Sequence, residues 1–199
     1  MAKKVKGLNN VETRDDLSNL LRVLKEIKEA VLDGDTAKLN ELSNGTIHSA
    51  TVSQNPINTI IAVLAYAFSK VFSRDNYQRM EGWDVFRDSL LTNLSLMIVA
   101  AERGDSEGVI LGAGKIRHSL NSISSRLKFY IKEIFRKAEI NKAFKLYEHG
   151  LSSEKTAKLL GISLWELASY IGQSNISEAR VAITLPEKER VKYVEEFFK

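Results

Sequence analysis

Helix-breaking residues are almost absent from this sequence. Only two prolines, Pro56 and Pro186, occur in 199 residues, and both stand where a helix could begin. Proline lacks the backbone N–H that a helix interior needs and clashes with the preceding turn, so a chain with so few prolines can carry long helices. Apolar residues also recur every three or four positions over most of the chain, which is typical of amphipathic helices. We therefore expect an all-α fold.

An N-terminal helical bundle is expected over residues 1–137. Its helices should start near residues 13, 35, 56, 83 and 105, and the last of them should be long, ending near 137. Pro56 opens a helix that is apolar on nearly every side, so we expect this helix at the centre of the bundle. Trp83 lies on an apolar stripe and should be a core residue.

Composition excludes several classes of protein. The sequence contains no cysteine, so disulfides and thiolate metal sites are excluded. The most apolar run, residues 60–68, is followed by a serine and a lysine and is shorter than the ~20 residues that a membrane span needs. The N-terminal lysines have no apolar segment behind them, so no signal peptide is expected. These observations favour a cytoplasmic protein without membrane contact.

Residues 138–173 have the pattern of a helix-turn-helix. Ser152 is placed to cap a short helix, and Ser163 with Glu166 forms a capping box for the next one. The two helices of this motif cross closely, which requires a small residue on the first helix and a positive φ in the turn. Ala157 and Gly161 supply these two features.

The apolar residues of this segment also fit the motif. Four of them should fill the shared core: Leu160, Ile162, Leu167 and Tyr170. At Thr156 an apolar residue is more usual. The alternative to a helix-turn-helix is an ordinary helical hairpin that needs the same glycine and alanine.

One stretch of the chain resembles a known family. The string AFKLYEHGLSSEKTAKLLGISLWELASYIG, residues 143–172, resembles the helix-turn-helix of small archaeal and bacterial proteins that are regarded as antitoxins or regulators. Those proteins carry similar AAELLGIS-W-E strings. The resemblance implies DNA binding and a toxin as a protein partner, but it does not extend to the N-terminal bundle.

Positive charge is concentrated just before and within this motif. Residues 115–145 carry a net charge of +7 in a chain whose total is +4, so the remainder carries −3. Lys128, Lys132 and Arg136 are spaced four residues apart and should form one ridge, the basic ridge, which could contact phosphates. The other candidate DNA-binding residues are Lys155, Ser163, Trp165, Ser169 and Gln173.

A protein-interaction adaptor is the alternative function that the sequence leaves open. The last helix of the motif carries one charged residue, Glu166, and Trp165 falls on its outer side, where it could contact a protein. The basic segment could equally be a solvated helix face. The expected partner is therefore double-stranded DNA or a protein, and a homodimer is a further option.

The sequence GVILGAGK, residues 108–115, resembles a phosphate-binding loop without matching it. The glycine spacing is one residue too long, no hydroxyl residue follows Lys115, and no strand precedes the segment. We expect Gly108, Gly112 and Gly114 to allow close helix packing or a kink instead.

The three histidines do not form a metal-binding or catalytic pattern. None of them has a second histidine at the spacing of a helical ligand pair, and no G-x-S-x-G string is present. We expect His48 to be a core histidine with satisfied hydrogen bonds; a polar cluster with His118 is the alternative. The sequence therefore predicts no enzymatic activity, no cofactor and no metal site.

Residues 174–199 have a pattern of their own. Val181, Ile183 and Leu185 alternate with less apolar residues, which suggests a short extended segment, and Pro186 then reads as the start of a C-terminal helix. We expect this helix to bury Val194 and Phe198 against the bundle or against a second chain.

Overall fold

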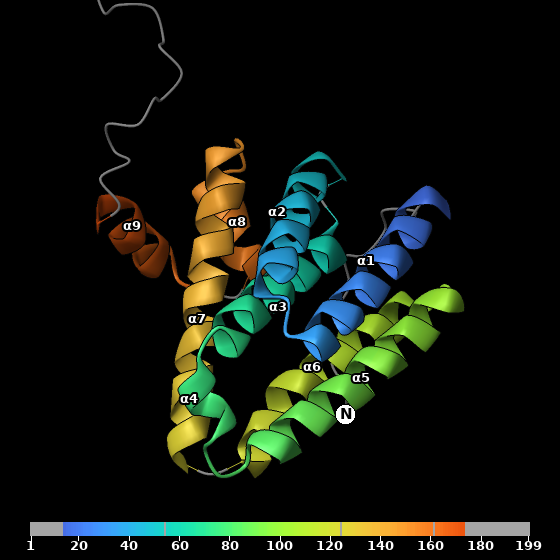
Figure 1. Cartoon of the computed structure of the whole chain (residues 1–199). Coiled ribbons are helices and arrows are strands. Elements are labelled where there is room, and N and C mark those ends of the chain that lie inside the picture. Colours follow the sequence, from blue (N-terminus) through green and yellow to red (C-terminus); the bar gives the residue numbers. More distant parts are fainter. Residues whose placement is uncertain (1–13, 54, 124, 161, 174–199) are drawn as a thin grey trace, which may run out of the picture.

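The chain folds into an all-α structure over the residues that the computed structural model describes, 14–173 without 54, 124 and 161. Figure 1 shows α7 as a long column with α9 on its outer side, and the α5–α6 hairpin at the opposite side of the molecule. The elements are α1 (Arg14–Asp33), α2 (Thr36–Ser53), α3 (Pro56–Phe72), α4 (Asp75–Gln78), α5 (Trp83–Glu102), α6 (Ser106–Ser119), the 3-10 helix η1 (Leu120–Ser122), α7 (Ser125–Glu148), α8 (Ser153–Leu160) and α9 (Leu164–Gln173).

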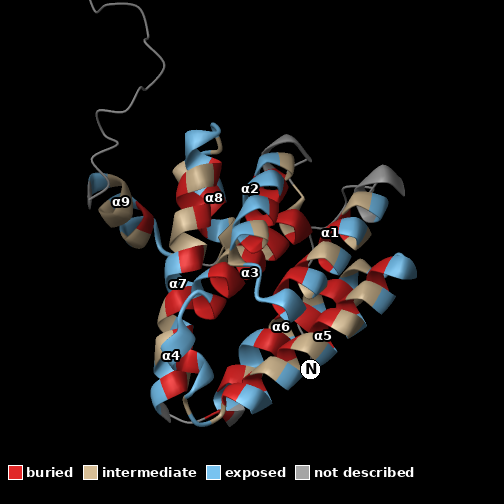
Figure 2. Cartoon of the chain, viewed as in Figure 1, coloured by how far each residue is buried: buried red, intermediate tan, exposed pale blue. Residues whose placement is uncertain are grey.

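Helix α3 is the centre of the bundle, as the sequence predicted. Pro56 occupies its first turn, and the Asn55 side chain accepts a hydrogen bond of 2.9 Å from the backbone N–H of Ile57. Buried residues occupy most of its positions (Figure 2), and Phe68 is among the fully buried ones. Trp83 is also a core residue, packed edge-on against Phe72 at 5.2 Å between ring centroids.

The expected single helix over residues 105–137 is wrong. Helix α6 ends at Ser119, η1 follows, and Ile123 is extended, with a φ of −92° and a ψ of 165°. Ser119, Asn121 and Ser122 precede the break, and such short polar side chains compete with helical backbone hydrogen bonds. The break lets α6 pack on α5 while α7 turns back along α3.

Two of the three glycines in α6 allow the close packing that the sequence predicted. A Cβ at Gly108 would lie 2.9 Å from the Cβ of Ala100, and a Cβ at Gly112 would lie 2.3 Å from the Cγ of Met97. Gly114 differs, because a Cβ there would meet no heavy atom within 4 Å. The expectation of close packing is therefore wrong for Gly114.

Helix α7 joins the bundle to the helices that follow it. The expected boundary at residue 137 falls inside this helix, whose Phe135 packs edge-on against Phe68 of α3 at 6.2 Å between ring centroids. The predicted extended segment and C-terminal helix at 174–199 lie outside the described residues. Among the residues that the structure does describe, each helix is too short or too polar to cross a bilayer.

Candidate nucleic-acid interface

Helices α8 and α9 are short and are separated by residues 161–163. At the start of α9, the Ser163 hydroxyl accepts from the backbone N–H of Glu166 at 3.1 Å, and the Glu166 carboxylate accepts from the backbone N–H of Ser163 at 2.9 Å. The predicted capping box is thus confirmed. The Ser152 hydroxyl accepts from the backbone N–H of Lys155 at 3.3 Å, which confirms the cap of α8.

The two short helices share a core with α7. Leu167 is buried against Ala143 and Phe144 of α7, and the half-buried residues around them are Leu160, Ile162, Tyr170 and Ile171. The ring centroids of Phe144 and Tyr170 are 5.6 Å apart, in an edge-to-face arrangement. The four core residues expected from the sequence therefore meet, and Ala157 is buried as predicted. Gly161, the expected turn residue, lies outside the described residues.

Thr156 is fully buried in α8, at the position where the sequence pattern would favour an apolar residue. Its hydroxyl oxygen has no hydrogen-bond partner among the described residues. A buried hydroxyl without a partner loses its hydration and gains nothing in exchange, so it lowers stability.

Arg136 connects the basic ridge to α9. Its guanidinium forms an ion pair with the carboxylate of Glu166, although 30 residues separate the two in sequence. The pKa of Glu166 is held below its ordinary value, first by the hydrogen bond from the Ser163 backbone and also by Arg136. Glu166 therefore stays ionised, and Arg136 offsets a negative charge that would otherwise repel phosphate.

The other two residues of the basic ridge differ in exposure. Lys132 is exposed, whereas Lys128 is half-buried, and the described part of the chain offers neither of them an ion-pair partner. Phe129 was not predicted as a surface residue, yet 63% of it is exposed, three residues from Lys132 on the same helix. The outer side of α7 thus combines unpaired cations with an aromatic ring.

The remaining candidate residues lie on α8 and α9. Trp165 is 80% exposed, which confirms its predicted place on the outer side of the helix. Ser163 and Lys155 are exposed, and Ser169 is half-buried. Gln173 is the last residue of α9, and its side chain is not among those described. Leu164 is 52% exposed beside Trp165.

Lys142 is a buried charged residue that sequence reasoning missed. It is 1% exposed, its Nζ donates to Oδ1 of Asn44 at 3.1 Å, and it lies 4.6 Å from the ring centroid of Tyr66. Burial, aided by nearby Lys145 and Lys70, lowers the pKa of Lys142 to about 8. The sequence does hint at this burial, because Lys142 lies four residues from both Ala138 and Leu146 and so shares their side of α7, and both of those residues are buried.

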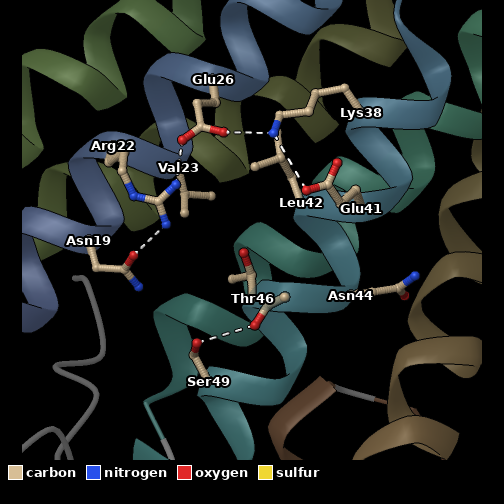
Figure 3. Close-up of a pocket in the computed structure, with 11 residues that line it drawn as sticks. Asn19, Arg22, Val23, Glu26, Lys38, Glu41, Leu42, Asn44, Thr46 and Ser49 are labelled. Atoms are coloured by element: carbon tan, nitrogen blue, oxygen red, sulfur yellow. Dashed lines mark hydrogen bonds and ion pairs between the residues drawn. The ribbon is translucent and has the colours of Figure 1, made fainter.

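A groove of 440 Å³ lies between α1 and α2 and is lined mainly by polar and charged residues (Figure 3). Its charged side chains pair with one another: Glu26 accepts from Arg22 and lies 3.2 Å from Nζ of Lys38. The groove therefore presents no unpaired charge to a ligand. Asn44 points away from it, toward α7 and Lys142.

The expectation of a core histidine is wrong. His48, His118 and His149 are all exposed, and His48 contacts His149 edge-on, with 5.6 Å between the ring centroids. His118 lies on α6, whereas this pair lies on α2 and just after α7. Within the described part of the chain, no three His, Asp or Glu side chains come together as a metal site would require.

The comparisons with other proteins add no family to this picture: no family model, no curated protein and no solved structure matches the chain.

Proposed function

We propose that the chain is a DNA-binding regulator in which α9 enters the major groove of a duplex while the basic ridge contacts phosphates. Helices α8 and α9 have the lengths, caps and shared core typical of a helix-turn-helix. The observation that carries the proposal is the pair of Arg136 and Glu166, because it shows that the N-terminus of α9 lies beside the basic helix, where Lys128 and Lys132 remain unpaired among the described residues.

Two groups of residues have different tasks in this proposal. Phosphate contacts come from three lysines, Lys128, Lys132 and Lys155. These contacts orient the protein on the duplex but do not distinguish one DNA sequence from another. Ser163, Trp165 and Ser169 face the bases. Serine hydroxyls can hydrogen-bond base edges, and an indole can pack on a thymine methyl group. Because no arginine reads guanine here, sequence specificity should be modest.

A salt series on duplex binding tests the proposal. Fluorescence anisotropy of a labelled mixed-sequence duplex should show affinity that falls steeply with salt, because phosphate contacts release counterions. The double substitution Lys128→Ala and Lys132→Ala should weaken binding and reduce the slope of log K against log salt by about two.

The matched control is the double substitution Lys28→Ala and Arg103→Ala. These residues lie on α1 and at the end of α5, which Figure 1 places on the far side of the molecule from α9. The control removes the same net charge, so it should leave the slope almost unchanged. Equal effects of the two double variants, or an absence of duplex binding at low salt, would refute the proposal.

A protein-interaction surface on α9 is the second candidate function. Leu164 and Trp165 are adjacent, both are exposed, and Glu166 is the only charged residue between 163 and 173. Exposed aromatic residues of this kind are frequent anchors of protein interfaces. For this candidate, Trp165→Ala should abolish binding to the protein partner, and the affinity of the unchanged chain should depend only weakly on salt.

A further inference from the structure

A second cavity, of 380 Å³, lies where α8 meets the bundle. Its volume is within the range of small-molecule sites in proteins, about 300–1,000 Å³. It is formed by α3, α6, α7 and α8 and is lined by Ile60, Val63, Leu64, Ile110, Ala113, Gly114, Arg117, Phe135, Glu139, Lys158, Leu159 and Leu160. Most of this lining is apolar, so the cavity suits an apolar ligand body.

Gly114 explains why part of this space is empty. It lines the cavity from the interior of α6, and a Cβ at this position would meet no heavy atom within 4 Å. Alanine inside a helix is more favourable than glycine by about 1 kcal/mol, so glycine lowers the stability of α6 here. Unlike Gly108 and Gly112, Gly114 relieves no close contact between helices. Its effect is to leave the wall of the cavity without a side chain.

Three charged residues line the otherwise apolar cavity. Arg117 of α6 and Glu139 of α7 form an ion pair of 2.9 Å, and the Glu139 side chain is only 12% exposed. Burial raises the pKa of Glu139 above its ordinary value, against the opposing effects of Arg117 and Arg136. Lys158 of α8 is exposed and has no ion-pair partner among the described residues. Glu139 matches Arg117, so the lining has one positive charge in excess.

We propose that this cavity binds a small molecule with an apolar body and a single carboxylate. The apolar body would lie against Val63, Phe135 and the bare backbone of Gly114. The carboxylate would pair with Lys158 and with the free side of the Arg117 guanidinium, which has more donors than one carboxylate can use. The ligand would touch α8 and the bundle at once. This proposal does not depend on DNA binding.

Decanoate is a suitable probe, because it combines a flexible apolar chain with one carboxylate. Calorimetric titration of the full chain should show saturable binding of one decanoate per chain. Decanol has the same apolar chain without the charge and should bind more weakly. Lys158→Met should lower the affinity for decanoate about five- to tenfold, the loss expected of one charge-assisted contact. The affinity for decanol should not change.

Gly114→Leu places a side chain in the cavity from its wall and should lower the affinity for decanoate at least tenfold. Leucine favours helix over glycine, so the variant should melt no lower than the unchanged chain. Gly45→Leu is the matched control: Gly45 also lies inside a helix with open space at its Cβ, but it lines the groove between α1 and α2. This control should bind decanoate normally.

The outcomes separate the proposal from its rivals. Binding that Gly45→Leu abolishes and Gly114→Leu preserves would place the probe in the other groove and overturn the proposal. Equal affinity for decanoate and decanol would show that the cavity does not recognise a carboxylate. An absence of saturable binding would show that the cavity is not a ligand site. If Gly114→Leu failed to fold, Ile110→Phe would fill the same cavity from one turn earlier on α6 and would carry the same expectation.

Discussion

Lys142 and Asn44 are 98 residues apart in sequence, yet Nζ of the lysine donates a hydrogen bond of 3.1 Å to Oδ1 of the asparagine. The bond joins α7 to α2, and the ring of Tyr66 from α3 covers the ammonium at 4.6 Å. Lys142 is the one charged residue that is buried among those the structure describes. It fixes the half of α7 that carries α8 and α9, but burial of its charge opposes folding.

Lys142→Met should raise the free energy of unfolding at pH 7 by about 1–3 kcal/mol, since methionine fills similar space without a charge. The pKa of Lys142 is about 8 in the folded chain, against an ordinary value of 10.5. Between these two pH values the unfolded chain binds a proton here and the folded chain does not, so stability of the unchanged protein rises with pH. The advantage of the variant should therefore shrink by about 3 kcal/mol from pH 7 to pH 11.

Urea unfolding of both proteins at several pH values measures this difference directly. Lys137→Met is the control, because Lys137 is on the same helix, is exposed and does not act on the Lys142 pKa. Its effect on stability should be small and nearly independent of pH. A constant difference between Lys142→Met and the unchanged chain would show that the Lys142 pKa is not lowered.

Thr156→Val should stabilise the protein by about 1 kcal/mol, because the valine has the same shape and removes a buried hydroxyl without a partner. Valine and threonine have similar helix propensities, so the change tests the hydroxyl alone. Thermal and urea unfolding would measure the gain. Thr92→Val on the exposed side of α5 is the control and should change stability by no more than about 0.5 kcal/mol. A loss of stability in Thr156→Val would mean that the hydroxyl is hydrogen-bonded.

The helix ends and their caps could be predicted from the sequence because they depend on neighbouring residues. Pro56 and the pair of Ser163 and Glu166 act within one turn of a helix. Gly34, with a φ of 68°, lies between α1 and α2, just before the predicted start of the second helix near residue 35. The same local reasoning failed after Ser119, where a polar stretch outweighed the apolar period on both sides of it.

The features that join distant segments could not be predicted. The burial of Lys142 and the contact of His48 with His149 depend on how α7 packs against α2. The pair of Arg136 and Glu166 depends on the angle at which α9 leaves α8. Periodicity indicates which face of a helix is buried, but it does not indicate which other helix covers that face.

Ser163→Ala should lower the stability of α9 by about 1 kcal/mol, because it removes the hydroxyl that caps the helix. Hydrogen exchange is the appropriate measurement, since it reports the opening of α9 separately from the bundle. Amides of α9 should exchange faster in the variant, while those of α3 should not change. The control is Ser73→Ala, where the hydroxyl donates to the backbone of Lys70 at the other end of a helix. Unchanged protection of α9 would show that the capping box contributes little.

Glu166→Gln tests the negative charge of Glu166, which lies on the proposed DNA-binding surface and would repel phosphates. Glutamine can keep the capping box, because it also accepts from the backbone N–H of Ser163, but it removes the negative charge beside the duplex. The variant also frees Arg136 from its ion pair, so that the guanidinium can contact a phosphate. Duplex affinity at low salt should therefore rise about three- to tenfold and its salt slope should increase by about one.

Arg136→Ala should instead weaken duplex binding, because it leaves Glu166 ionised and unpaired. Glu41→Gln on α2 removes an exposed acid far from α9 in sequence and should leave duplex affinity nearly unchanged. If Glu166→Gln and Arg136→Ala both left duplex binding unchanged while Trp165→Ala abolished binding to a protein, the surface of α9 would be a protein interface.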